Sequence, residues 1–180
     1  EKLPEYGENW EPENAEKVHR DILESSMTLL ENKEGTLPWL FANGRITVIN
    51  VANITASGKP FIEHLKRTLG RSYIIDSFVV GKDGSGWAGG EISQSCEKAN
   101  LVIVNFLETS NKPSRKYGII DSAVKKCSSK ISEFKSDSLN TTKWVVNLFA
   151  NPYALDANWG EMKENVDALI MAYQDDFRTQ

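Results

Sequence analysis

Several features that would mark a specialised class of protein are missing from this 180-residue sequence. No apolar run approaches the roughly 18 residues that a membrane-spanning helix needs. Lys and Arg form no basic cluster, and the net charge is −4 with a pI near 5.3. A nucleic-acid-binding domain normally carries a concentrated positive charge. We therefore expect neither a membrane span nor a nucleic-acid partner.

Histidine and cysteine are also scarce, with two of each. His19 and His64 lie far apart without a partner at ligand spacing, so we predict no metal site. The triplet His19-Arg20-Asp21 is spelled like a kinase catalytic motif but falls inside a predicted helix, without the glycine-rich loop that a kinase needs. Cys96 and Cys127 also fall on predicted helices, either as half-buried thiols or as a disulfide between neighbouring helices.

What the sequence does contain is a globular composition, with 40% hydrophobic and 26% charged residues. Short apolar runs bounded by turn residues alternate with helix-like segments. This pattern predicts a three-layer α/β/α sandwich with a mainly parallel sheet of about five strands. We expect strands at 45–52, 72–80, 101–107, 144–149 and 168–173, and helices at 60–69, 87–99, 119–134 and between the last two strands. Ile103, Val146 and Leu148 are predicted core residues.

The N-terminal region has a different character. We expect residues 1–13 to be a loose segment, 14–40 a linker helix that leads into the domain, and 41–180 the sandwich itself. Val18, Ile22, Leu29 and Leu30 recur at helical spacing, which predicts a helix from Pro12 to about Asn32. The chain stops soon after the last predicted strand. Either the final helix is missing, because the chain is a piece of a longer protein, or the N-terminal helix covers that face.

Two motifs closely resemble the C-terminal domain of glycoside hydrolase family 3, in its β-N-acetylglucosaminidase-like branch. The first is NLFANPYALDANW followed by DALIMAYQDD. In the family, a buried strand runs into Gly-Asn-Pro-Tyr-Ala-Leu and the next strand ends in Ala-Tyr-Glu/Gln-Asp, so Ala150 stands where the family often has glycine. The second motif, ESSMTLLENKEGTLP, resembles the family's linker into this domain. The resemblance covers residues 14–176.

The resemblance implies a non-catalytic accessory domain. It implies that a TIM-barrel domain of the same polypeptide carries the nucleophilic aspartate and a His-Asp acid/base pair, so this chain alone is expected to be inactive and to need no cofactor. The carbohydrate, with β-linked N-acetylglucosamine favoured, would be bound through that barrel. In the glucosidase branch an acid/base glutamate can come from the C-terminal domain, but no glutamate here can be matched to it. The resemblance favours a periplasmic or extracellular location.

The loop from Asn151 to Asp156 is the candidate barrel- or substrate-facing surface. Loops that follow parallel strands gather at one edge of the sheet, where such folds bind their ligands. Pro152 restricts Asn151, and Tyr153 offers an apolar ring with a polar tip. The alternative is a purely local turn. Glycoside hydrolysis needs two carboxylates, and Asp156, Asp175 and Asp176 lie near predicted strand ends. Acidic caps and solvated loop ends are the preferred interpretation of these three residues.

A glycine-rich stretch supports a competing function. Gly84-Ser85-Gly86-Trp87-Ala88-Gly89 fits the dinucleotide fingerprint, with Glu108 at the end of the next strand as the acidic residue. A free-standing module that binds a nucleotide or small anion at Gly84–Gly90 is therefore the alternative. Asp83 and the bulky Trp87 argue against a phosphate-cradling loop, and a ligand-free interaction domain is the third possibility.

Overall fold

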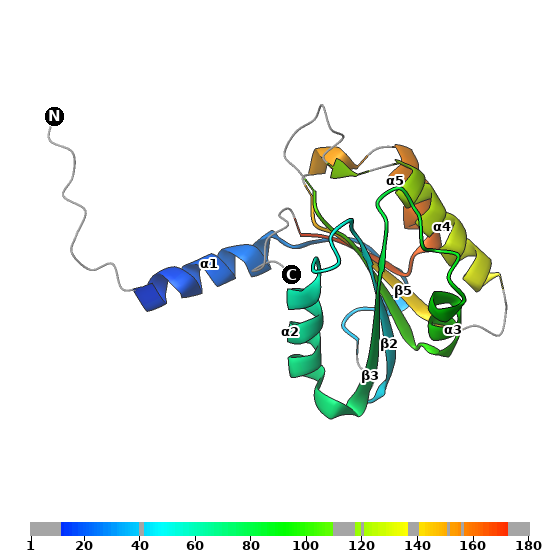
Figure 1. The fold of residues 1–180 in the computed structure, drawn as a ribbon. Coiled ribbons are helices and arrows are strands. Elements are labelled where there is room, and N and C mark those ends of the chain that lie inside the picture. Colours follow the sequence, from blue (N-terminus) through cyan, green and yellow to red (C-terminus); the bar gives the residue numbers. More distant parts are fainter. Residues whose placement is uncertain are drawn as a thin grey trace, which may run out of the picture.

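The computed structural model describes residues 12–39, 42–109, 118–119, 121–136, 141–150, 152–155 and 157–172. Its centre is a six-stranded sheet in the order β1-β6-β5-β4-β2-β3 (Figure 1). The parallel strands are β2 (Gly44–Val51), β3 (Tyr73–Val80), β4 (Leu101–Phe106), β5 (Lys143–Leu148) and β6 (Ala168–Met171). An antiparallel strand, β1 (Thr28–Asn32), lies beside β6 at one edge. The predicted mainly parallel α/β sheet is confirmed, with one strand more than expected.

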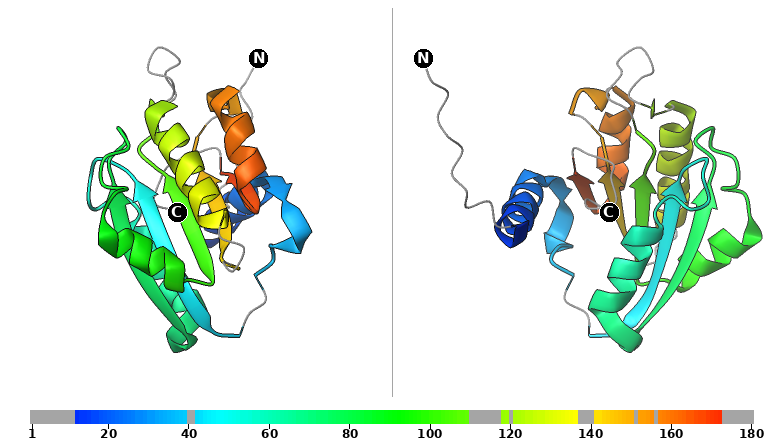
Figure 2. Two further views of the ribbon diagram at one scale, coloured as in Figure 1. Left: turned by 90° about the vertical axis from the view of Figure 1, so that its right-hand side faces the viewer. Right: turned by 60° about the vertical axis from the view of Figure 1, so that its left-hand side comes forward.

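Helices cover both faces of the sheet and make three layers (Figure 2). One face packs against α2 (Lys59–Leu69). The opposite face packs against α3 (Gly90–Lys98), α4 (Asp121–Lys135) and α5 (Ala157–Asn165). Short 3₁₀ turns complete the framework: η1 (Lys33–Gly35), η2 (Gly70–Ser72) and η4 (Pro152–Ala154).

The central strand β4 shows why the sandwich forms. All six of its residues are buried, because successive side chains of a strand point to opposite faces and both faces are covered by helices. Ile103 packs on the α2 side, whereas Val102 and Val104 join the cluster under α3, α4 and α5. The predicted core residues Ile103, Val146 and Leu148 are confirmed, with exposures of 7%, 0% and 0%.

The N-terminal helix is shorter than predicted. It forms α1 (Pro12–Ser26), and the expected continuation to Asn32 is wrong because Thr28–Asn32 is strand β1. The backbone of this segment pairs with β6, and Leu30 packs against the core. Tertiary pairing with an open strand edge therefore overrides the local helical spacing.

Helix α1 extends away from the sheet (Figures 1 and 2). The expectation that it covers the open face of the sheet is therefore wrong. Whether a further helix follows β6 falls outside the described residues, which end at Ala172. The boundaries after residues 13 and 40 stay predictions, although β1 shows that the predicted linker segment contributes a strand to the sheet.

The third helix begins later than predicted, at Gly90 rather than Trp87. Gly89 has an extended backbone, with φ of −66° and ψ of 125°, so the helix starts only after it. Gly84 and Gly86, which precede Trp87, adopt left-handed φ angles of 80° and 88°. The side chain of Trp87 is only 4% exposed and belongs to the core cluster. The stretch is therefore an ordered loop that is anchored by its tryptophan.

A buried carboxylate organises the amino edge of the sheet. Asp167 precedes β6, and its carboxylate accepts a 2.7 Å hydrogen bond from the backbone N–H of Trp144. Lys135 lies 2.8 Å and Lys143 3.6 Å from the same carboxylate, whose side chain is 9% exposed. These contacts join the start of β5 and of β6 to the end of α4.

Candidate functional site

The parallel strands end together at one edge of the sheet, which we call the carboxyl edge. Backbone hydrogen bonds of 2.9–3.3 Å continue the ladders one residue beyond the strands. The side chains of these extra residues form a small buried cluster together with Phe61 of α2: Ala52, Leu107, Phe149 and Ala172. The loops after these strands therefore all begin at one buried apolar cluster. The predicted gathering of these loops at one edge is confirmed for their described parts.

Glu108 is the polar centre of the carboxyl edge. It follows β4 and holds a left-handed backbone with φ of 56°, which is uncommon for a residue with a side chain. Its carboxylate accepts hydrogen bonds from the N–H of Asn53 at 3.0 Å, the N–H of Ile54 at 2.6 Å and the hydroxyl of Ser57 at 2.8 Å. One side chain thus contacts the turn between β2 and α2 at three positions.

Three further contacts bring neighbouring loops to the same place. The ammonium group of Lys82, after β3, donates a 2.6 Å hydrogen bond to the carbonyl of Glu108. The backbone N–H of Lys82 donates to the side-chain oxygen of Asn53 at 3.3 Å. The hydroxyl of Thr109 donates to the carbonyl of Phe149 at the end of β5. Loops after four consecutive parallel strands are therefore linked.

The environment of Glu108 favours its charged form. Burial by itself would raise the pKa of the carboxyl group. The hydrogen bonds from Asn53, Ile54 and Ser57 and the positive charge of Lys82 act in the opposite direction and outweigh burial, so the pKa lies below its ordinary value of 4.5. Glu108 is an ionised, hydrogen-bonded carboxylate at neutral pH.

A ladder of asparagines lies beneath this edge, on the α2 side of the sheet. The side-chain amide of Asn147 donates to Asn105, and that of Asn105 donates to Asn50, each at 2.9 Å. The three residues face one another in register on β5, β4 and β2. A Cβ atom at Gly58 would lie 2.5 Å from the Asn50 side chain, so the turn before α2 rests directly on the ladder.

Several polar groups of the Gly84–Gly90 loop are already hydrogen-bonded to the loop or to residues beside it. The N–H of Gly84 donates to the carbonyl of Gly81, and the N–H of Ser85 donates to the carboxylate of Asp83, both at 2.8 Å. The ammonium group of Lys126 donates to the carbonyl of Gly84 at 3.0 Å. The hydrogen bonds from Ser85 hold the pKa of the Asp83 carboxyl below its usual value. A negative charge and several occupied N–H groups thus stand where a phosphate would bind.

Of the predicted barrel-facing residues, only Tyr153 lies among those that the structure describes; Asn151 and Asp156 fall outside them, as do Asp175 and Asp176. Tyr153 is on η4, directly after the β5 loop, and is 79% exposed. Its neighbours Ala154 and Leu155 pack against the core. The sequence did not point to Ser57 or Lys82, and it singled out Glu108 only as a fingerprint acid. The one available signal was a polar residue two positions after a strand end, as Asn53, Lys82 and Glu108 are after β2, β3 and β4.

The histidines and cysteines that the sequence analysis considered lie in ordinary structural positions. His19 lies within α1, and His64 on α2 is exposed and contacts Arg67 at 2.9 Å. Cys96 and Cys127 are free and fully buried rather than half-buried; burial raises the pKa of Cys96 to about 12 and that of Cys127 even further. Within the described parts of the chain, His, Cys, Asp and Glu form no group of three that could hold a metal ion. None of the described helices is long and apolar enough to cross a membrane.

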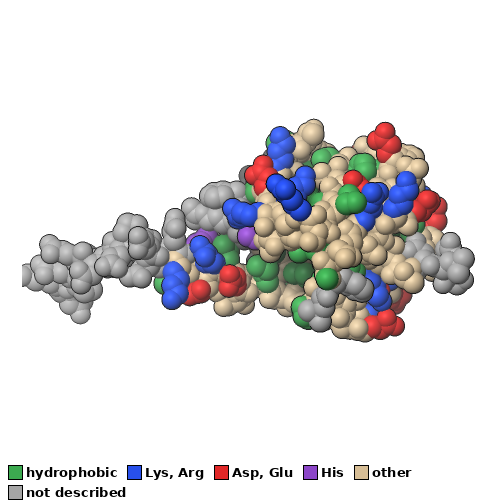
Figure 3. Space-filling view, turned by 90° about the horizontal axis from the view of Figure 1, so that it is seen from below, with side chains coloured by type: hydrophobic (Ala, Val, Ile, Leu, Met, Phe, Trp, Pro, Cys, Tyr) green, Lys and Arg blue, Asp and Glu red, His purple; other side chains and the backbone are tan. Residues whose placement is uncertain are grey.

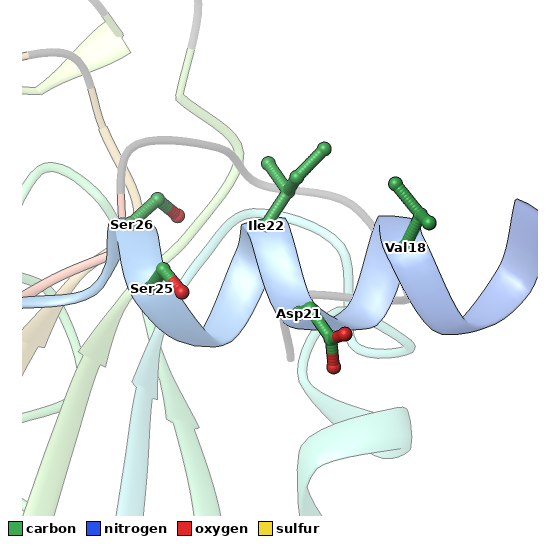
Figure 4. A pocket seen from close by; sticks show the side chains of 5 residues that line it. All are labelled: Val18, Asp21, Ile22, Ser25 and Ser26. Carbon is green, nitrogen blue, oxygen red and sulfur yellow. The ribbon is translucent and has the colours of Figure 1, made fainter.

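A second candidate surface lies on α1 and β1. Four apolar side chains are exposed there by 47–61%, and we call them the apolar stripe: Val18, Ile22, Met27 and Leu29. Val18 and Ile22 point to the same side of α1, where a shallow depression is also lined by Asp21, Ser25 and Ser26 (Figure 4). Seen from below, α1 extends from the body of the molecule (Figure 3). On that body, positive and negative side chains are interspersed.

The sequence matches no protein-family model and no curated protein, but the fold matches solved structures. One is a β-N-acetylglucosaminidase of glycoside hydrolase family 3 from Paenibacillus sp. str. FPU-7, with 14% identity, a TM-score of 0.63, and coverage of 99% of this chain and 31% of that one. A fungal multi-domain β-N-acetylglucosaminidase of the same family gives 15% identity, a TM-score of 0.58, and coverage of 93% and 17%. A Listeria innocua β-glucosidase gives 15% identity, a TM-score of 0.56, and coverage of 95% of this chain and 25% of that one.

These similarities establish the fold. The chain spans less than a third of the length of each of the three proteins, while almost the whole of this chain is aligned. The fold expected from the two sequence motifs is therefore confirmed.

Proposed function

We propose that this chain is the C-terminal α/β domain of a family 3 glycoside hydrolase and that it packs against a TIM-barrel catalytic domain of the same polypeptide. Two independent observations support the proposal. The motifs at 147–159 and 167–176 are similar to those of the family, and the fold aligns over 93–99% of the chain with enzymes that are more than three times longer. In this arrangement the barrel performs the hydrolysis and this domain positions or encloses its substrate.

The observation that carries the docking part of the proposal is the apolar stripe. A 15-residue helix is marginally stable in water by itself, and most helices in proteins depend on the packing of an apolar face. Val18 and Ile22 lie on such a face, yet they are 56% and 61% exposed. Exposed apolar patches of this kind mark interaction surfaces. A domain that precedes α1 in the polypeptide would be held close to the stripe, so its effective concentration there would be high.

The carboxyl edge is the proposed second contact, with the loop of Asn151, Tyr153 and Asp156 facing the mouth of the barrel. Ligands of α/β folds bind beyond the carboxyl ends of the strands. Tyr153 is 79% exposed at this edge and combines an apolar ring with a polar tip, which suits a wet interface. The motifs favour a substrate with β-linked N-acetylglucosamine. A β-glucoside is the alternative, because the similar structures include a β-glucosidase.

Association with the separately expressed N-terminal part of the parent protein tests the docking surface. Val18→Gln/Ile22→Gln should weaken binding at least tenfold, because both apolar contacts are lost. The matched control is Arg20→Gln/Glu24→Gln, which changes exposed residues elsewhere on the same helix and should leave binding unchanged. Equal binding by the stripe variant and the wild type would reject this docking surface.

A second comparison tests the edge. Asn151→Ala/Tyr153→Ala should weaken association, whereas Arg71→Ala/Ser72→Ala at the amino edge should not. A loss from the amino-edge pair alone would show that the domain docks in the opposite orientation. The isolated chain should not hydrolyse an aryl β-N-acetylglucosaminide, since the barrel supplies the nucleophile. Turnover that is abolished by changing one carboxylate of this chain would reject the accessory role itself.

A further inference from the structure

The strand order creates a switch point between β2 and β4. Strand β2 lies between β3 and β4, and the chain leaves β2 towards α2 on one face of the sheet. After β4 the chain continues to α4 on the opposite face. Loops that diverge in this way leave a crevice at the carboxyl ends of the strands, which is where open α/β sheets bind ligands. In this protein the turn after β2 and Glu108 lie at this switch point, in direct hydrogen-bond contact.

The turn presents a convergent set of hydrogen-bond donors. The consecutive backbone N–H groups of Asn53 and Ile54 and the hydroxyl of Ser57 all donate to the two carboxylate oxygens of Glu108, at 2.6–3.0 Å. Ile54 and Ser57 share one oxygen and Asn53 bonds the other. Successive N–H groups that point to one centre form an anion-binding concavity. Hydrogen bonds from such groups to a charged carboxylate are stronger than neutral ones.

The turn is held in this shape by contacts that do not involve Glu108. The N–H of Ser57 donates to the carbonyl of Ile54 at 2.9 Å, and the N–H of Lys59 donates to the carbonyl of Ala56 at 3.2 Å. Gly58 has a left-handed φ of 81° and lies directly against Asn50. The donors should therefore remain in place when the carboxylate is removed.

We propose that the turn at Asn53–Ser57 is an anion-binding cradle for a carboxylate and that the side chain of Glu108 is its built-in occupant. A carboxylate fits because its two oxygens accept from the two consecutive N–H groups. The ammonium group of Lys82, which donates to the carbonyl of Glu108, supplies a positive charge nearby. The cradle is closed to outside anions while Glu108 fills it, and removal of that side chain opens it to a free carboxylate. The proposal stands on the contacts of this edge and is independent of the proposed function.

The test is replacement of the occupant by a free anion. Glu108→Gly removes the side chain, and glycine tolerates the left-handed backbone at this position. Titration with sodium formate, at an ionic strength held constant with chloride, should shift the amide resonances of Asn53 and Ile54 saturably. The expected dissociation constant is roughly millimolar, as for a very small ligand. Formate should also raise the thermal midpoint of this variant.

Two controls separate the cradle from general salt effects. The wild type should show no saturable shift, because Glu108 occupies the donors. Glu91→Ala removes an exposed carboxylate from the first turn of α3 and should show none either. Absence of saturable shifts in Glu108→Gly, or equal shifts in the wild type, would overturn the proposal. If Glu108→Gly does not fold in chloride, refolding in formate becomes the measurement: recovery of the fold supports the cradle, and failure in both salts overturns it.

Discussion

The side-chain amide of Asn105 donates a 2.9 Å hydrogen bond to the side-chain oxygen of Asn50, and the two residues are 0% and 3% exposed. Asn147 extends the same ladder from β5. Buried amides are costly unless they are hydrogen-bonded, and these three satisfy one another across the central strands. Because the turn before α2 rests on Asn50, the ladder also supports the carboxyl edge.

Asn105→Ala should therefore be strongly destabilising. It removes both hydrogen bonds of the ladder and leaves polar groups of Asn50 and Asn147 buried without partners, at an expected cost of about 2–4 kcal/mol. Urea unfolding measures this change. Ser77→Ala, an exposed change on β3, is the control and should cost well under about 1 kcal/mol. Similar small losses for both variants would mean that the ladder contributes little.

The core prediction concerns Ile103 and Leu148, whose side chains are 7% and 0% exposed. Truncation of either to alanine leaves a cavity between the sheet and its helices, so each should lose about 2–5 kcal/mol of unfolding free energy. Ile74 on edge strand β3 is 56% exposed and provides the matched control. Its change to alanine should cost less than about 1 kcal/mol. The comparison requires urea melts of all three variants.

Asp167→Ala should destabilise the amino edge of the sheet. The change removes the acceptor of the Trp144 N–H and the partner of Lys135. Because both lysines near Asp167 remain partly exposed, the expected loss is about 2–3 kcal/mol rather than that of a fully buried charge. Glu133→Ala breaks an exposed ion pair with Lys130 and should cost under about 1 kcal/mol. Equal thermal midpoints of the two variants would contradict the prediction.

Glu108 should make stability depend on acid pH. Its pKa in the folded protein is lower than the 4.5 of an unperturbed carboxyl group, so the folded state binds this proton less readily than the unfolded state. Its contribution is fully present above pH 4.5 and is lost as the pH falls through the folded-state pKa. Unfolding free energies measured from neutral pH downward should therefore decline more steeply for the wild type than for Glu108→Gln. Parallel curves would show that this carboxylate is not stabilised by folding.

The glycine-rich loop should bind no nucleotide. Asp83 places a negative charge in the loop, Gly84 and Ser85 already donate their N–H groups within it, and Trp87 is buried in the core. Calorimetric titration with NAD, ATP and FMN should give no saturable heat. A micromolar isotherm that Gly86→Val abolishes would instead favour the nucleotide-binding alternative.

The pattern of local sequence was sufficient for most of the α/β framework. Runs such as Leu101–Phe106 and Lys143–Leu148 are buried on both faces, so each consists of consecutive, mostly apolar residues. Such a run predicts a strand from the local sequence alone. Pro60 near the start of α2 and Gly70 at its end likewise mark that helix locally. The family-like motifs also lie in consecutive residues, which is why they predicted the fold without the structure.

The remaining features depend on partners that are distant in sequence. Thr28–Asn32 becomes a strand only because β6 offers an open edge, and its helical spacing gave no sign of this. Likewise, Glu108 meets Asn53 and Ile54 across 55 and 54 residues, so its role follows from β2 and β4 being neighbours in the sheet. Local propensities are set by neighbouring residues and could be deduced from the sequence. The polar contacts at the carboxyl edge are set by strand order and register, which only the packed tertiary structure determines.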